Sequence, residues 1–125
     1  MAAWVSENAG ALEGHLSLHG TDAERVRRPW LEALPVPIEQ LAVVSRFFVA
    51  TGARGRGVGG ALMTTAEDYA AAQGRRLVLD VADHNVDAIA FYERRGWRRA
   101  GTTSLVLEDG QTTLALVLFV LPESR

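Results

Sequence analysis

The sequence contains neither cysteine nor lysine, although the chain is 125 residues long. Without cysteine, disulfide bonds and a catalytic thiolate are both excluded. All thirteen basic residues are arginine, so every site that depends on a lysine side chain is excluded as well. The net charge of −2 argues against a nucleic-acid partner bound through bulk electrostatic attraction.

Long apolar runs are also missing from the chain. No stretch approaches the roughly 20 apolar residues that are needed to span a bilayer. The N-terminus lacks the basic and then apolar pattern of a signal peptide. Hydrophobic residues still make up 48% of the chain, enough for one packed core. We therefore expect a single cytoplasmic domain over residues 1–125, with no membrane partner.

Apolar patterning predicts an α/β protein. Strands are expected over residues 2–7, 11–19, 41–49, 76–82, 97–101 (with an extension over 105–107) and 112–121, and helices over 61–73 and 85–95. Residues 20–40 are polar and interrupted by proline, which indicates a long connection with one helical turn near 22–28. The order β-β-β-α-β-α-β-β predicts an α+β mixed sheet with helices.

A glycine-rich run lies between the third expected strand and the first expected helix. Its residues are Arg54, Gly55, Arg56, Gly57, Val58, Gly59 and Gly60. In such a turn, backbone N–H groups converge on an anion, and the N-terminus of the helix lies behind them. The two arginines add positive charge in a geometry that suits phosphate. The run therefore predicts a ligand that carries phosphate.

Two classes of phosphate ligand fit this run poorly. A P-loop nucleotide site needs a lysine beside its last glycine, and this chain has none. The residues from Gly55 to Gly60 do match the dinucleotide pattern G-x-G-x-x-G, and Asp80 lies about 20 residues further on. However, that pattern begins at a strand end, whereas residues 50–54 intervene here, and the remaining chain is short for a doubly wound sheet.

The third class is coenzyme A. The spacing Arg54-x-x-Gly57-x-Gly59 resembles the pyrophosphate loop of the GCN5-related N-acetyltransferases (GNAT family). A second block, from Asn85 to Trp97, is similar to that family's N-x-x-A-x-x-F-Y-x-x-x-G-F/W segment. The resemblance covers residues 4–120, and it implies the family's acyl-CoA N-acyltransferase fold. It further implies acetyl transfer from acetyl-CoA to a primary amine by direct attack, with no metal.

The resemblance also implies roles for individual residues. Tyr92 would protonate the leaving thiolate, and Asp80 occupies the position at which some members carry a catalytic glutamate. The cofactor would be bound by Phe47, Phe48 and Val49 of the preceding strand, by Arg54 to Gly60, by Asn85 and by Tyr92. Glu39, His15 and His19 remain alternatives to Asp80 as the general base. The acceptor amine, a small molecule or a peptide, is not defined by these residues.

The chain departs from the family at its start. GNAT proteins begin with a strand and one or two helices ahead of the first hairpin, whereas this sequence starts at the hairpin. An uncovered sheet edge invites pairing, so a homodimer or another partner chain is expected to cover it. If the missing segment removed the acceptor site, the alternative is an acyl-CoA-binding module that acts through a partner without catalysis.

Overall fold

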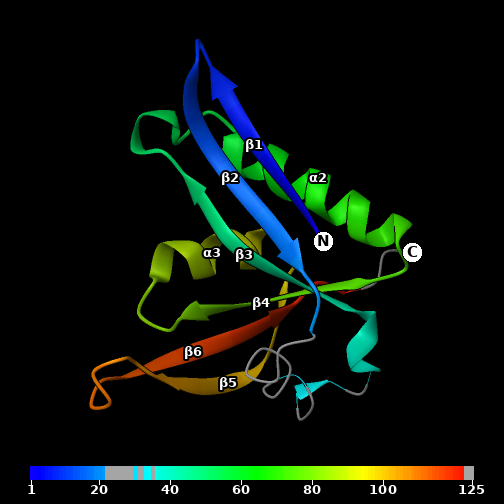
Figure 1. Cartoon of the computed structure of the whole chain (residues 1–125), viewed down its shortest axis with the longest axis vertical. Coiled ribbons are helices and arrows are strands. Elements are labelled where there is room, and N and C mark those ends of the chain that lie inside the picture. Colours follow the sequence, from blue (N-terminus) through cyan, green and yellow to red (C-terminus); the bar gives the residue numbers. More distant parts are fainter. Residues whose placement is uncertain (22–29, 31–32, 35, 123–125) are drawn as a thin grey trace. The chain divides into compact units, whose positions relative to one another are not determined.

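A computed structural model describes residues 1–21, 30, 33–34 and 36–122 (Figure 1). The helical turn expected near residues 22–28 lies outside the described residues. The described strands and helices follow the predicted order β-β-β-α-β-α-β-β. They divide into two compact units, residues 1–21 with 39–77 and residues 22–38 with 78–125, and the division falls within strand β4.

The first unit contains three antiparallel strands in the order β1-β2-β3. They are β1 (Ala2–Asn8), β2 (Ala11–His19) and β3 (Leu41–Val49). Ala9 and Gly10 both have positive φ between β1 and β2, which fits a two-residue hairpin turn. A 3₁₀ turn, η1 (Ile38–Gln40), leads into β3. The bounds predicted for β2 and β3 are confirmed, and β1 extends one residue further.

Helix α2 (Val58–Ala72) packs along β1 and β2 (Figure 1). It buries Leu62, Met63, Ala66 and Ala70, and the ring of Trp4 on β1 contacts Tyr69 edge to face at 5.3 Å. The helix ends at Ala72, one residue before the predicted end, and Gly74 follows with a φ of +68°. Gly74 N–H donates to the Ala71 carbonyl and Arg75 N–H to the Ala70 carbonyl, which closes the helix. The sequence placed its start at Ala61, which is three residues too late.

The second unit contains the strand order β4-β6-β5, again antiparallel. Its elements are β4 (Arg76–Ala82), of which residues 78–82 belong to this unit, α3 (Val86–Arg94), β5 (Arg98–Val106) and β6 (Thr113–Val120). The sequence divided β5 into two pieces, and this was wrong. The pairing with β6 shifts by one residue between Arg99 and Gly101, where an extra residue forms a bulge, and the strand continues beyond it to Val106.

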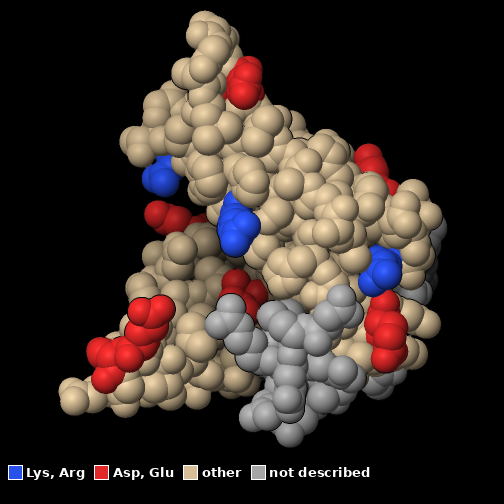
Figure 2. Space-filling model, viewed as in Figure 1, with Lys and Arg blue, Asp and Glu red and all other residues tan. Residues whose placement is uncertain are grey.

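Both units contain apolar side chains that are almost fully buried. In the first unit, Leu16, Leu18, Leu41 and Met63 are almost fully buried, and in the second unit Trp30, Leu79, Leu118 and Phe119 are. Among the described helices, none is long and apolar enough to cross a membrane. On the face shown in Figure 2, arginine and acidic side chains are interspersed and form no large patch of one sign among the described residues.

Candidate active site

The glycine-rich run forms a turn that ends in the first turn of α2. A 3₁₀ turn, η2 (Thr51–Ala53), follows β3, and residues 54–57 then lead to the helix. Gly57 is the N-cap residue of α2, with φ +80° and ψ 9°. A side chain rarely adopts this left-handed conformation, so glycine is required there by the backbone. Gly59 and Gly60 lie within the helix and not in the turn before it.

The earlier start of α2 places several backbone N–H groups at the glycine run. The first helical hydrogen bond runs from Ala61 N–H to the Gly57 carbonyl at 3.0 Å. The N–H groups of Val58, Gly59 and Gly60 therefore precede the helical hydrogen-bond pattern and have no carbonyl partner within α2. Together with the positive end of the helix dipole, they can bind an anion.

The two arginines of the run have different partners. Arg54 Nε donates to the Val49 carbonyl at 3.3 Å, which ties the turn to the end of β3. Arg56 forms an ion pair with Glu13 of β2, and the other carboxylate oxygen of Glu13 accepts a hydrogen bond from Ser6 Oγ at 3.0 Å. The side chain of Glu13 is only 13% exposed. The positive charge of Arg56 is thus balanced by a carboxylate that the sequence reasoning did not consider.

Gly14 of β2 brings the start of α2 close to the strands, and sequence reasoning missed this role too. A Cβ atom at Gly14 would lie 2.9 Å from Leu62 Cδ1, 3.1 Å from Val58 Cγ1 and 3.1 Å from the Phe48 carbonyl oxygen. The close packing of Val58 and Leu62 against β2 offsets the low helix propensity of the two glycines in the first turn. An isolated glycine within a strand is itself a signal of close approach.

The last residues of β3 are more exposed to solvent than the first ones. Residues 41–44 are buried, whereas the end of the strand is partly open and Phe48 is 47% exposed. The expected pantetheine-binding residues, Phe47, Phe48 and Val49, all lie in this open part. Since Arg54 donates to the Val49 carbonyl, the structure brings this strand end and the glycine run together within the first unit.

In the second unit, Asn85 caps α3. Its Oδ1 accepts a hydrogen bond from Ala88 N–H at 3.2 Å, the usual arrangement of an N-cap residue. Asp87 in the first turn and Arg94 in the last turn complement the helix dipole. The helix ends at Arg94, one residue before the predicted end. Gly96 N–H donates to the Glu93 carbonyl and Trp97 N–H to the Tyr92 carbonyl, which closes the helix. Asn85 thus has a structural role that leaves its expected contact with the cofactor untested.

Tyr92 lies in the last turn of α3 and is buried among aromatic rings. Its ring centroid is 5.5 Å from that of Phe91, 5.8 Å from that of Trp97 and 5.7 Å from that of Phe119. Burial, and secondly the charge of Asp80, raise the pKa of Tyr92 to about 12. The phenol is therefore protonated at neutral pH and can donate a proton or a hydrogen bond.

The candidate general bases lie in different surroundings. Asp80 is exposed on β4, opposite Leu118 of β6, and its charge acts on Tyr92 within the same unit. Glu39 is exposed in η1 of the first unit. His15 Nδ1 contacts the Arg46 carbonyl at 2.7 Å, and His19 Nδ1 contacts the Gly20 carbonyl at 3.0 Å. Among the described residues, no three His, Asp or Glu side chains gather that could hold a metal ion.

Comparison with known proteins adds a sequence match to this geometry. Residues 3–97 match the acetyltransferase (GNAT) family. The chain belongs to the GNAT family. An uncharacterized N-acetyltransferase of Methanocaldococcus jannaschii is 44% identical over 59 residues, which are 46% of this chain and 26% of that protein. The uncharacterized N-acetyltransferase YhfO of Bacillus subtilis is 35% identical over 63 residues, 50% of this chain and 42% of YhfO.

Solved structures show that the fold is that of GNAT proteins, as the sequence predicted. A putative streptothricin acetyltransferase from Bacillus anthracis, solved with acetyl coenzyme A, has a TM-score of 0.74 at 19% identity over 98% of this chain and 62% of its own. An N-acetyltransferase from Staphylococcus aureus has a TM-score of 0.72 at 23% identity, over 95% and 66% of the two chains. The chain thus spans under half the length of these two curated relatives and about two thirds of these solved chains.

Proposed function

We propose that this GNAT protein transfers the acetyl group of acetyl-CoA to a primary amine by direct attack. The observation that carries the proposal is the glycine run, in which a left-handed Gly57 opens α2 and leaves three N–H groups ahead of the helical hydrogen bonds. A diphosphate fits such a site, because the backbone can approach it closely and the helix dipole favours negative charge. Family membership makes coenzyme A the expected diphosphate.

The cofactor would be held by the glycine run and by the end of β3. Its pyrophosphate would bind the N–H groups of residues 57–60 and the guanidinium of Arg54, while the backbone of Phe47, Phe48 and Val49 would pair with the pantetheine arm. A backbone N–H of this strand end would then donate to the oxyanion that forms from the thioester carbonyl. Asn85 would also contact the cofactor.

Asp80 and Tyr92 would supply the base and the acid. Asp80 would take a proton from the ammonium, whose ordinary pKa of about 10 leaves little free amine at neutral pH. The amine would then attack the thioester carbonyl, so that a C–N bond forms and, as the tetrahedral intermediate collapses, the C–S bond breaks. Tyr92 would give its proton to the departing sulfur and regain one from the acylated nitrogen, so that its protonation state is restored.

The raised pKa of Tyr92 sharpens this role. At a pKa of about 12, the phenol is a weaker acid than a thiol, whose ordinary pKa is about 8.5. Transfer of the proton even to the departing thiolate would therefore be uphill unless the phenolate regains a proton from the nitrogen. We infer that Tyr92 first donates a hydrogen bond to the sulfur and passes its proton only as the nitrogen proton replaces it.

Binding of acetyl-CoA tests the cofactor part of the proposal. A ligand at 100 times its dissociation constant should stabilise the folded state by about 2.7 kcal/mol, which thermal unfolding measures readily. Acetyl-CoA is expected to raise the unfolding temperature, and desulfo-CoA should do so as well because it keeps the pyrophosphate. If neither compound raises the unfolding temperature, the protein does not bind the cofactor and this part of the proposal is refuted.

Thiol release separates catalysis from binding alone. An active enzyme should release CoA thiol when a suitable amine is added to acetyl-CoA, whereas an acyl-CoA-binding module that acts through a partner should bind without release. A panel of peptide N-termini, lysine peptides, amino acids, polyamines and aminoglycosides would identify the acceptor. Release without any added amine would indicate hydrolysis and would contradict transfer to an amine.

A homodimer and a cytoplasmic location complete the proposal. In the described part of the first unit, β1 pairs only with β2, so its other edge lies at the end of the strand order. Val5 on this strand is 56% exposed. Pairing of two β1 edges would satisfy the open backbone groups. Sedimentation at micromolar concentration should show a dimer, and a single monomeric species would exclude it; cell fractionation tests the location.

A further inference from the structure

Strand β3 contains a bulge that includes Phe47, the first of the strand residues proposed to bind acetyl-CoA. His15 of β2 is paired with Phe48, whereas Ser17 is paired with Ser45. One residue of β2 between these pairs therefore faces two residues of β3, Arg46 and Phe47. Such a bulge interrupts the regular ladder of backbone hydrogen bonds and redirects the strand.

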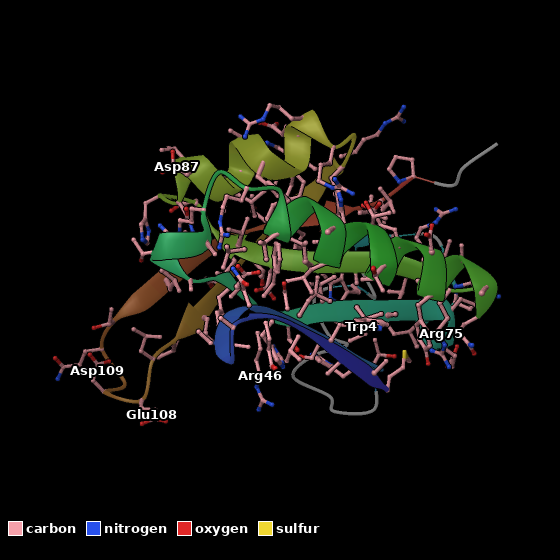
Figure 3. The ribbon with its side chains drawn as sticks, turned by 90° about the horizontal axis from the view of Figure 1, so that it is seen from above. Trp4, Arg46, Arg75, Asp87, Glu108 and Asp109 are labelled. Carbon is pink, nitrogen blue, oxygen red and sulfur yellow. The ribbon has the colours of Figure 1, made fainter. Side chains whose placement is uncertain are left out.

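The backbone conformation at the bulge is unusual. Arg46 has a φ of +48°, in the left-handed region that residues with a Cβ atom seldom adopt. The other residue with a side chain and positive φ, among those described, is Ala9 in the hairpin turn. The side chain of Arg46 projects away from the strands (Figure 3). Its conformation is therefore held by contacts of its backbone.

Two side chains of β2 bind the carbonyl groups at this bulge. His15 Nδ1 lies 2.7 Å from the Arg46 carbonyl oxygen, and Ser17 Oγ donates to the Ser45 carbonyl at 3.0 Å. A carbonyl oxygen can only accept, so Nδ1 of His15 carries the hydrogen. The imidazole also stacks on Phe48, with ring centroids 5.6 Å apart and planes 12° apart. His15 thus contacts β3 on both sides of Phe47.

The hydrogen bond from His15 to the Arg46 carbonyl also fixes the orientation of the next N–H group. In a planar trans peptide, the carbonyl of Arg46 and the N–H of Phe47 belong to one rigid unit and point in opposite directions. We propose that His15 is a positioning residue, which holds the bulge of β3 and so sets the backbone orientation at Phe47–Val49. Its effect on acetyl transfer rests on the proposed function, whereas its effect on the bulge does not.

Asparagine and glutamine form a matched pair for testing this role. The side-chain nitrogen of asparagine is as many bonds from Cα as Nδ1 of histidine, whereas that of glutamine is one bond further away. Both variants lose the aromatic stacking on Phe48. His15→Asn can therefore keep the hydrogen bond to the Arg46 carbonyl, and His15→Gln cannot reach it in the same geometry.

Nuclear magnetic resonance measures the bulge without any ligand. Wild-type His15 should show the tautomer with hydrogen on Nδ1, a measurement that needs no variant. Amide hydrogen exchange at residues 46–48 should rise about tenfold in His15→Gln, the scale of one hydrogen bond, but stay near the wild-type rate in His15→Asn. Amides of α2 serve as the internal control. The opposite tautomer, or equal exchange in the two variants, would overturn the proposal.

Kinetics then separates this inference from the proposed function. The ratio kcat/KM for acetyl-CoA should be roughly 3- to 10-fold lower in His15→Gln than in His15→Asn, with most of the loss in kcat. If wild-type protein neither binds nor uses acetyl-CoA, the proposed function fails, and the exchange rates still decide the role of His15. If acetyl-CoA is used equally by both variants, the positioning role is wrong although the function stands.

Discussion

The two units present their candidate residues in opposite ways. In the first unit, the turn from Arg54 to Gly57 is exposed and offers backbone N–H groups and guanidinium groups. In the second unit, Tyr92 is 8% exposed and its pKa is raised by burial and by the charge of Asp80. Open backbone suits the binding of a highly charged anion, whereas burial suits the control of a proton.

This difference predicts how variants of the two units should behave. Changes in the glycine run should alter the affinity for acetyl-CoA, because they alter backbone conformation or charge where a diphosphate would bind. Changes at Tyr92 should alter turnover, because a proton donor acts only when the C–S bond breaks. If a glycine-run variant mainly lowers turnover, or a Tyr92 variant mainly lowers affinity, the roles assigned to these residues are wrong.

The largest effect is expected for Tyr92→Phe. The substitution keeps the aromatic packing and removes the hydroxyl, so kcat should fall about 100-fold, the lower range for loss of a general acid. The dissociation constant for acetyl-CoA should stay within about twofold. On binding, the wild-type hydroxyl exchanges a hydrogen bond to water for one to the sulfur, so its net contribution to affinity is small. Steady-state thiol release and calorimetry measure the two quantities. Unchanged turnover would remove the acid role from Tyr92.

The next effect concerns stability at alkaline pH. Because burial raises the pKa of Tyr92 to about 12, the folded state holds this proton more tightly than the unfolded state, whose tyrosine titrates near 10. Titration of Tyr92 leaves the free energy of unfolding unchanged below pH 10 and lowers it by about 2 to 3 kcal/mol as the pH rises toward 12. Urea unfolding at several pH values measures this loss.

The composition makes the alkaline experiment easy to interpret. The chain has no lysine and no cysteine, and it has only two tyrosines, so few other side chains titrate between pH 9 and 12. Tyr92→Phe should flatten the dependence of unfolding free energy on pH, whereas Tyr69→Phe serves as the matched control. A curve that stays equally steep in Tyr92→Phe would contradict the assignment of the raised pKa.

A smaller effect is expected at the glycine run. Gly57→Ala places a Cβ atom on a residue with φ +80°, and the left-handed conformation costs such a residue roughly 1 to 2 kcal/mol. Alanine should therefore favour a relaxed turn, and the affinity for acetyl-CoA should fall about tenfold because binding must restore the left-handed conformation; kcat should change little. Gly52→Ala is the matched control, because it has neither positive φ nor a neighbour within 4 Å of the added Cβ. Equal affinity in both variants would indicate that Gly57 does not shape the binding site.

Much of the fold could be predicted from the sequence because its signals are local. The bounds of β2, β3 and β4 followed from apolar patterning, and Gly74 and Gly96 marked the helix ends. The start of α2 was misplaced because two glycines argue locally against a helix. Packing against Gly14, which is distant in the sequence, outweighs that preference.

The candidate site was only partly accessible to the same reasoning. The glycine run and Tyr92 were found through motifs, since the chemistry of a phosphate loop leaves a pattern in consecutive residues. Glu13 and His15 were not given their structural roles, because an ion pair with Arg56 and a hydrogen bond to the Arg46 carbonyl connect residues about 30 to 40 positions apart. No local pattern carries such pairings, although Gly14 between them signalled a close approach.

The smallest effect is expected for Glu13→Gln, which removes the ion-pair partner of Arg56 in the glycine run. Glu13 neutralises Arg56, so a diphosphate that binds Arg56 would compete with a carboxylate. Glu13→Gln keeps an acceptor for Ser6 and removes the charge; affinity for acetyl-CoA should rise about threefold, the scale of a partly exposed ion pair. The gain should shrink at high salt because the charges are screened. Glu7→Gln on β1 makes the same change in net charge and should leave affinity unchanged. A loss of affinity in Glu13→Gln alone would mean that Glu13 holds Arg56 in place for the ligand and does not compete with it.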